Sequence, residues 1–380
     1  MNVLDIAKKL NKEFKDDKLA TIANVTPTYE KLPIGALGFD YPLFGGLPEG
    51  RIITFAGLFH SGKSTAACLA MSAYQRKYPE KTCVYIDQEH SLDLKFQARM
   101  TGIQLDKMIY LSPTTLTGEQ VLDTILEFQK ADNIGMIVLD SLPALLPAQS
   151  LENDMTKDPG MRGTIAKPLH RFLVAMSGLV SEKQNMFIMV NQVRVSGTTF
   201  TGAPIYTEPA GQAPAYYSSI KVRFGTRTFI KGEKVDASDG EGADGFRLKF
   251  VITKNKCGSV ARGGGFISFS YANGLMWLDD MMEIASKFGF VQKNGAYCTL
   301  INLKTNEPYI NEDTGTVLKA YMKDIKDYLK THIAFQKEYV DMLNEYIKGE
   351  EVTYGDILDA RESDEIKTQE EIVSQHSFTD

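Results

Sequence analysis

One stretch, residues 57–64, constrains this chain more than any other. It reads Gly-Leu-Phe-His-Ser-Gly-Lys-Ser, and it lies between an apolar run at residues 51–57 and a helical pattern at residues 63–77. This is the P-loop pattern GxxxxGK[ST], placed between a strand and a helix as its chemistry requires. The glycines let successive backbone N–H groups surround a phosphate, and the helix N-terminus adds positive potential. The stretch therefore predicts a site for a nucleoside triphosphate.

The residues of this loop have distinct predicted roles. Lys63 can reach the β- and γ-phosphates, and the hydroxyl of Ser64 can bind Mg²⁺. A glycine turn with a surface lysine is the alternative, but it does not explain the strand before the loop and the helix after it. The predicted nucleotide-binding residues of the loop are Gly57, Leu58, Phe59, His60, Ser61, Gly62, Lys63, Ser64 and Thr65.

Two acidic residues follow other apolar runs. Asp140 ends the run at residues 136–140, where a Walker-B carboxylate would help to hold Mg²⁺. Glu89 follows the run at residues 83–87, where it could orient or deprotonate an attacking water. Each could also be an ordinary acid in a turn or a solvated loop, and it is the P-loop that favours the functional reading.

The order of apolar and helical segments predicts an α/β fold. Apolar runs at residues 51–57, 83–87, 136–140 and 186–193 alternate with helical patterns at residues 63–77, 118–130 and 163–184. This alternation is typical of a mainly parallel, buried and twisted sheet, whose ligands bind at the carboxyl ends of the strands. Strand patterns at residues 220–230, 246–256 and 264–271 have no helix between them, so we expect an antiparallel extension of the same sheet.

Four regions are expected along the chain. Residues 1–34 form a short amphipathic helix and an extended arm, and residues 35–271 form the α/β core that contains the P-loop. Residues 272–350 form a small α+β domain, within which an apolar stripe at residues 317–329 has the period of a helix. Residues 351–380 form an acidic tail.

Composition and charge exclude other classes of protein. The 43% apolar content is typical of a globular chain, and the net charge of −6 argues against a wholly basic surface for nucleic acid. A local basic site remains compatible with that charge. Four cysteines without a CxxC pair indicate a reducing compartment, and no apolar run approaches the roughly 20 residues of a membrane span. A cytoplasmic protein without a membrane partner is expected.

Taken in order, the motifs resemble the RecA family of DNA strand-exchange recombinases over residues 35–270. The motifs are GGLPEGRI at 45–52, the P-loop, YIDQEHSLD at 85–93, TGEQ at 117–120, VLDSLPAL at 138–145, VNQVR at 190–194 and TKNK at 253–256. A lone P-loop is weak evidence for any family, whereas this ordered set is specific. The resemblance implies a RecA-like P-loop ATPase core with ATP and Mg²⁺ as cofactors. The divergence of the chain and its acidic end suggest a bacteriophage homologue.

The resemblance also implies roles for single residues. Glu89 matches the family's catalytic glutamate, and Phe96 matches an aromatic ring that stacks on adenine. Gln192 is similar to the family's sensor of the γ-phosphate. Lys254 and Lys256 are similar to paired lysines that reach the ATP of the neighbouring protomer. The arm within residues 1–34 is then a polymerisation arm.

Two loops of the family have counterparts, at residues 151–162 and 194–211. Arg162 and Arg194 in these loops, and Lys167 after the first loop, are candidate contacts to DNA phosphates, and Phe200 is a candidate base-stacking side chain. We expect the second loop to lack a fixed structure without DNA. Phe200 could equally pack on its own protein. This chain has Ala215 where the family has a lysine, which puts the signal from DNA to the ATPase site in doubt.

The resulting hypothesis is an ATP-dependent homologous recombinase. It would form a helical filament on single-stranded DNA and catalyse strand exchange with homologous duplex DNA, as a DNA-dependent ATPase. One alternative is a hexameric helicase, which would be expected to carry an arginine finger where this chain has Lys254 and Lys256. Another alternative is an ATP-gated coat protein for single-stranded DNA with little hydrolysis.

The acidity is concentrated at one end of the chain. Residues 351–380 contain nine acidic and two basic residues, so they carry −7 and leave residues 1–350 near neutral. The tail could simply keep the protein soluble. It could also mimic DNA and compete for a basic face that binds duplex.

Overall fold

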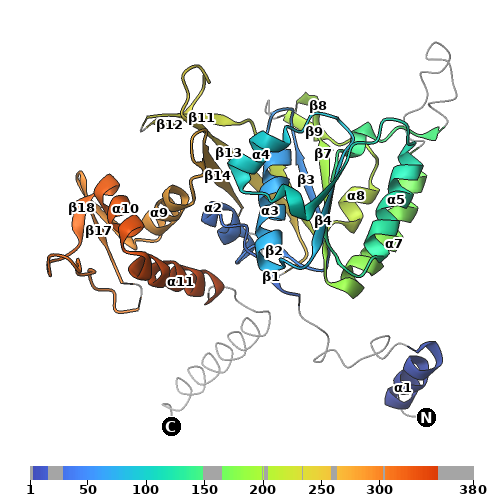
Figure 1. The fold of residues 1–380 in the computed structure, drawn as a ribbon, viewed down its shortest axis with the longest axis horizontal. Coiled ribbons are helices and arrows are strands. Elements are labelled where there is room, and N and C mark those ends of the chain that lie inside the picture. Colours follow the sequence, from blue (N-terminus) through green and yellow to red (C-terminus); the bar gives the residue numbers. More distant parts are fainter. Residues whose placement is uncertain are drawn as a thin grey trace, which may run out of the picture. The chain divides into compact units, whose positions relative to one another are not determined.

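The computed structural model describes residues 3–15, 29–148, 165–198, 200, 204–232, 234–257, 263–302 and 304–349 (Figure 1). Arg162, the loop at residues 151–162 and the tail at residues 351–380 lie outside these ranges. The chain divides into two compact units, residues 1–30 and residues 31–380. The first unit contains the helix α1 (Val3–Phe14), on which Ile6, Leu10 and Phe14 are exposed.

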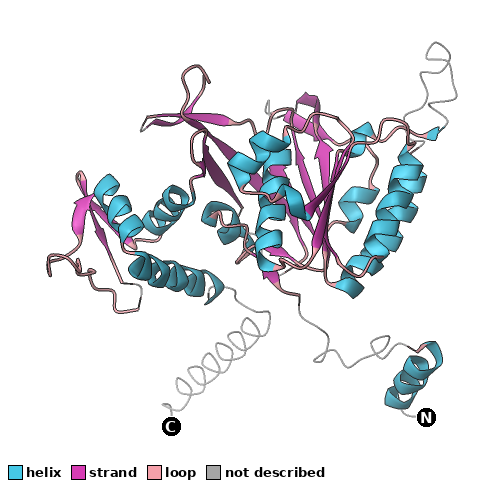
Figure 2. Cartoon of the chain, in the orientation of Figure 1, coloured by secondary structure: helices cyan, strands magenta, loops and turns pink. Residues whose placement is uncertain are grey.

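A twisted mixed sheet forms the centre of the second unit (Figure 2). Six of its strands run parallel in the order β10–β3–β7–β6–β4–β5. Their bounds are Ile220–Phe224, Arg51–Gly57, Met186–Gln192, Ile134–Asp140, Thr82–Asp87 and Met108–Leu111. The carboxyl ends of parallel strands lie at one edge, so Gly57, Gln192 and Asp140 end side by side there, as the alternating pattern predicted.

The predicted antiparallel extension is confirmed, with one difference. It comprises β11 (Thr228–Lys231), β12 (Lys234–Ala237), β13 (Gly245–Asn255), β14 (Gly264–Ser270) and β15 (Gly274–Leu275). The prediction of a single strand at residues 220–230 is wrong, because β10 and β11 are separate strands. They lie end to end along the long strand β13, to which β10 pairs at residues 250–255 and β11 at residues 245–247.

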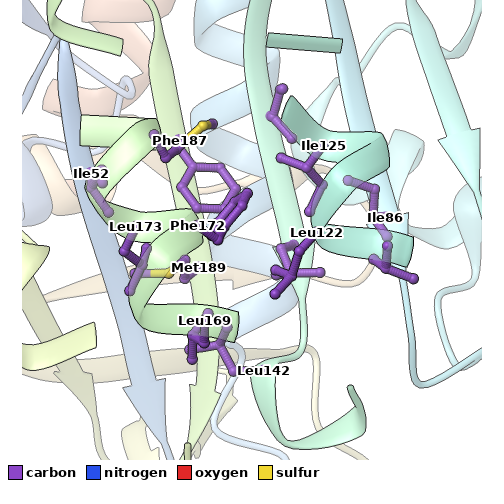
Figure 3. Close-up of a cluster of buried hydrophobic side chains, with 14 of the residues drawn as sticks. Ile52, Ile86, Leu122, Ile125, Leu142, Leu169, Phe172, Leu173, Phe187 and Met189 are labelled. Atoms are coloured by element: carbon purple, nitrogen blue, oxygen red, sulfur yellow. The ribbon is translucent and has the colours of Figure 1, made fainter. Parts of the chain in front are cut away.

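Helices cover the parallel part of the sheet. They are α3 (Lys63–Lys77), α4 (Leu94–Thr101), α5 (Gly118–Lys130), α7 (Ala166–Lys183) and α8 (Ala213–Tyr217). Apolar side chains of α5 and α7 pack with Ile52, Ile86, Phe187 and Met189 of the strands into a continuous core (Figure 3). A capping box of Thr117 and Gln120 starts α5, which explains why its predicted N-terminal boundary agrees with the structure.

Short elements flank the core. They are β1 (Lys31–Leu32), α2 (Leu37–Asp40), the 3₁₀ turn Tyr41–Leu43, β2 (Leu47–Pro48), the 3₁₀ turns Leu105–Lys107 and Leu142–Ala144, β8 (Arg194–Thr198) and β9 (Pro204–Thr207). No helix in the described part of the chain is long and apolar enough to cross a membrane.

A smaller α+β region follows, with its own buried core. Its elements are α9 (Trp277–Lys287), β16 (Val291–Asn294), β17 (Tyr297–Leu300), β18 (Lys319–Tyr321), α10 (Met322–Thr331) and α11 (Ile333–Gly349). The predicted helical stripe at residues 317–329 is helical only from Met322, because residues 319–321 pair with β17 as a strand. The three strands form an antiparallel sheet.

Candidate nucleotide and DNA site

The P-loop is shaped by glycines that no other residue could replace without strain. Gly62 caps α3 in the left-handed region, at φ 81°, and a Cβ atom there would lie 2.3 Å from a methyl carbon of Leu248. A Cβ atom on Gly57 would lie 2.5 Å from the Oγ of Ser61. Glycine at both positions lets the loop pack this closely at the N-terminus of α3, where an anion is favoured.

Lys63 is folded back over the loop. Its ammonium donates hydrogen bonds to the carbonyl oxygen of Leu58 at 2.8 Å and to the Oγ of Ser61 at 3.4 Å. Burial lowers the pKa of Lys63, and the charges of Asp140 and Glu89 act in the opposite direction. A buried ammonium that donates to two neutral oxygens is a favourable site for the negative charge of phosphate.

The predicted metal residues are in direct contact. The hydroxyl of Ser64 donates to the Oδ2 of Asp140 at 2.6 Å, and the hydroxyl of Tyr85 donates to the same oxygen, also at 2.6 Å. Asp140 is 6% exposed, and burial raises its pKa. The two hydroxyl donors lower that pKa, and the nearby charges of Glu89 and Asp87 raise it further.

The oxygen atoms of Ser64 and Asp140 are suitable ligands for Mg²⁺. A hydroxyl and a carboxylate are hard oxygen ligands of the kind that Mg²⁺ prefers, and they lie beside the phosphate loop. Among the described residues no group of three or more His, Cys, Asp or Glu side chains could hold a metal ion. Phosphate oxygens and water would therefore supply the other ligands, as is usual for this ion.

Glu89 lies beside the metal residues and is held from two sides. The hydroxyl of Ser141 donates to its Oε1, and the Nε2 of Gln192 donates to the same oxygen at 2.7 Å. The loop that carries Glu89 is fixed by the buried Asp87, whose Oδ1 accepts a hydrogen bond from the backbone N–H of Glu89 at 3.1 Å. The hydroxyl of Tyr110 donates to the other oxygen of Asp87 at 2.8 Å. The structure thus brings Glu89 and Gln192 together.

The second predicted loop has more structure than expected. Its described residues form the antiparallel hairpin β8–β9, in which Arg194 pairs with Thr207. The hairpin is anchored at its base: Glu208 accepts a hydrogen bond from the Nδ2 of Asn191 at 3.1 Å and forms an ion pair with Lys221 at 2.6 Å. Arg194 is exposed, and Phe200 is fully exposed. The expectation of no fixed structure at residues 194–211 is wrong for these strands, because strand pairing and the anchor order them.

Lys254 and Lys256 are not brought to the P-loop of their own chain. The ammonium of Lys254 donates to the carbonyl oxygens of Ala215 and Tyr216, and that of Lys256 donates to Tyr216. In the sheet Lys254 of β13 pairs with Lys221 of β10. Lys221 lies three residues before Phe224, which pairs with Gly57 of β3, and β13 is two strands away from β3. These offsets are roughly 10 Å along the strand and roughly 10 Å across the sheet. Burial, then the charge of Lys256, lowers the pKa of Lys254 to about 8.

Phe96 and Lys167 complete the predicted residues that the structure describes. Phe96 is half-buried on α4, next to Gln97, whose Nε2 donates to the Oγ1 of Thr65 at 3.4 Å. This contact places the helix of Phe96 beside the helix that follows the P-loop. Lys167 is exposed in the first turn of α7.

Four residues at the site were missed from the sequence. Tyr85 contacts Asp140, and Ser141 contacts Glu89. The contact between Asn191 and Glu208 joins the strand of Gln192 to the hairpin. Some signals were present. Tyr85 is a hydroxyl in an otherwise apolar run, and Ser141 directly follows the predicted Walker-B acid.

A family model and curated relatives match the sequence of this chain. The family model described as the RecA N-terminal domain matches residues 2–275. The RecA protein of Acholeplasma laidlawii is 28% identical over 330 residues, which cover 85% of this chain and 95% of the relative. That of Gluconacetobacter polyoxogenes is 32% identical over 273 residues, covering 72% and 74%. A RadB recombinase crystal structure aligns with a TM-score of 0.44 and 19% identity, covering 64% of this chain and 97% of that one.

Proposed function

This chain belongs to the RecA family, and on that premise we propose that it is an ATP-dependent recombinase that assembles on single-stranded DNA as a helical filament and exchanges strands with homologous duplex DNA. One observation carries the proposal, namely the hydrogen bond from Gln192 to Glu89. It joins the carboxylate best placed to meet an attacking water to the strand that leads into the exposed β8–β9 hairpin.

In the proposed hydrolysis of ATP each group near the loop has a separate task. Lys63 and the backbone N–H groups of the P-loop bind phosphate oxygens, and Ser64 with Asp140 holds Mg²⁺. The bound Mg²⁺ supplies positive charge that stabilises the phosphates. Glu89 accepts a proton from the attacking water as a general base. Phe96 stacks on the adenine ring.

Gln192 provides the proposed link between nucleotide and DNA. In the described state its amide donates to Glu89, so one oxygen of that carboxylate is occupied. A terminal phosphate near Gln192 would compete for the amide and free Glu89 to bind water. Gln192 follows Asn191, which donates to Glu208 at the base of the hairpin. Movement of this strand end would therefore also move the hairpin, which carries Arg194 and Phe200.

Assembly is proposed to complete the site. Lys254 and Lys256 lie away from the P-loop of their own chain, which fits a role at the ATP of a neighbouring copy. The exposed apolar side chains Ile6, Leu10 and Phe14 of α1 fit the proposed polymerisation arm at residues 1–34. The remaining proposed regions are the core at residues 35–271, the C-terminal domain at residues 272–350 and the acidic tail at residues 351–380.

Few contacts to DNA are proposed for each protomer: Arg162, Lys167 and Arg194 to phosphates and Phe200 to bases. One protomer with so few phosphate contacts would bind weakly and with strong dependence on salt. Polymerisation along a strand multiplies these contacts through effective concentration. The cytoplasm is the proposed location, and the burial of all four free cysteines is compatible with a reducing compartment.

Joint-molecule formation between a single strand and a homologous duplex tests the proposal. The full-length protein with ATP and Mg²⁺ is expected to form joint molecules, and Lys63→Ala is expected to form none. Electron microscopy of the same mixtures should show open filaments on DNA. Closed rings would favour a hexameric helicase, and filaments without joint molecules or DNA-stimulated hydrolysis would favour a coat protein.

A further inference from the structure

Tyr85 carries a polar hydroxyl in the buried core, where packing alone does not require one. It lies in β4, it is fully buried, and its ring faces the side of the sheet that carries Asp140. The hydroxyl donates to the Oδ2 of Asp140 at 2.6 Å. Phenylalanine would fill the same volume, so the hydroxyl is the part of this side chain that needs an explanation.

The contact controls how Asp140 is presented. The carboxylate of an aspartate can turn about two side-chain bonds and needs fixed donors to hold its orientation, and Asp140 has two hydroxyl donors on one oxygen. Ser64 is itself a proposed metal ligand, whereas Tyr85 is attached to a buried strand two residues before Asp87. Tyr85 is therefore the donor that anchors Asp140 to the rigid sheet.

We propose that Tyr85 is a positioning residue for the magnesium site, whose hydroxyl holds Asp140 in the orientation that receives the ion. This inference rests on the proposed function, because it concerns the nucleotide-bound metal of that site. Partners behind metal ligands commonly change metal affinity by 10- to 100-fold when they are removed, so the expected effect is large enough to measure.

The test compares two tyrosine variants that each lose one buried hydroxyl. Tyr85→Phe removes the contact to Asp140. Tyr74→Phe is the matched control, because Tyr74 of α3 is equally buried and its hydroxyl has no hydrogen-bond partner among the described residues. Binding of a fluorescent ADP analogue to the full-length protein is measured against Mg²⁺ concentration, and again in EDTA.

Tyr85→Phe is expected to raise the Mg²⁺ concentration at half-saturation by about tenfold, with the affinity for the analogue in EDTA unchanged. Tyr74→Phe is expected to match wild type in both measurements. Affinity in EDTA reports whether the pocket of each variant is folded, so a merely structural role would lower it together with Mg²⁺ affinity and would overturn the proposal.

Two further outcomes separate this inference from the proposed function. If wild type and Tyr85→Phe show the same Mg²⁺ dependence, the positioning role is wrong while the proposed function stands. If wild type binds the analogue with no dependence on Mg²⁺, the proposed nucleotide chemistry itself is wrong, and the inference is overturned with it.

Discussion

The Nε2 of Gln192 lies 2.7 Å from the Oε1 of Glu89, and this hydrogen bond joins two residues that are 103 positions apart in the chain. Each follows or ends a parallel strand at the same edge of the sheet, beside the P-loop. The amide also stands at the root of the β8–β9 hairpin. A change in what Gln192 contacts is therefore a change at both the hydrolytic site and the proposed DNA site.

Replacing Glu89 tests the general base. Glu89→Gln keeps the size of the side chain but cannot accept a proton, so the kcat of ATP hydrolysis with single-stranded DNA should fall by about 10²- to 10⁴-fold. Nucleotide binding should be retained. Glu127→Gln is a suitable control, because Glu127 is exposed and pairs with Lys130 on α5. Equal hydrolysis by Glu89→Gln and wild type would exclude Glu89 as the base.

Replacing Gln192 tests the coupling. Gln192→Ala removes the amide between Glu89 and the hairpin, so we expect the ratio of kcat with and without single-stranded DNA to approach one. Steady-state hydrolysis in a DNA titration measures this ratio, and DNA binding by fluorescence anisotropy shows whether the variant still occupies the strand. A variant that binds DNA and keeps the full stimulation would show that the signal takes another route.

Lys254 predicts a dependence of assembly on pH. Its pKa is lowered to about 8 in the single chain, first by burial and then by Lys256, so it loses its charge as pH rises through 8. If the charged form meets the ATP of a neighbour, the protein concentration at half-maximal DNA-dependent hydrolysis should be flat below pH 8. Above pH 8 it should rise by up to about tenfold per pH unit.

Lys254→Arg provides the comparison, since a guanidinium keeps its charge throughout this range. The variant should show no rise in half-maximal concentration between pH 8 and pH 9.5. If the half-maximal concentration rises above pH 8 in Lys254→Arg as it does in wild type, the titrating group is not Lys254.

Two buried carboxyls predict how stability depends on pH. Burial raises the pKa of Asp280 to about 7, against opposing hydrogen bonds from Ser268 and the charge of Arg247. Because this folded-state pKa lies above the unfolded value of 3.8, the contribution of Asp280 to stability is present below about pH 4 and lost as pH rises through 7. Asp280→Asn cannot ionise, so at pH 8 it should exceed wild type in free energy of unfolding by about 2–4 kcal/mol.

Asp40 is the contrasting case. Burial raises its pKa to about 7 as well, but its two oxygens accept hydrogen bonds from the backbone N–H groups of Ile34 and Gly35. In Asp40→Asn an NH₂ group would face one of these N–H groups, which should cost about 1–3 kcal/mol. In Asp280, by contrast, Oδ1 has no hydrogen-bond partner in the described part of the chain. Urea unfolding of both variants across pH 4–8 measures the difference, and the same change in the free energy of unfolding for both would contradict this expectation.

Much of the architecture was predictable because it depends on local pattern. The P-loop and the alternation of apolar runs with helices are short-range features, and the carboxyl-end rule for parallel strands then put Asp140 and Glu89 at one edge. The resemblance to the RecA family added roles for these residues. The bacteriophage origin suggested by the divergence of the chain and its acidic end stays a prediction, as do the DNA contacts.

Only the tertiary structure decided which side chains contact one another at the site. Strand order sets these contacts: β7 and β6 lie between β3 and β4, which brings Gln192 to Glu89 and Tyr85 to Asp140 across 103 and 55 positions. The same pairing divides residues 220–230 into two strands, orders the β8–β9 hairpin and puts Lys254 away from its own P-loop. Periodicity in a sequence reports which face of an element is buried, whereas contacts between distant residues depend on how elements are ordered and packed.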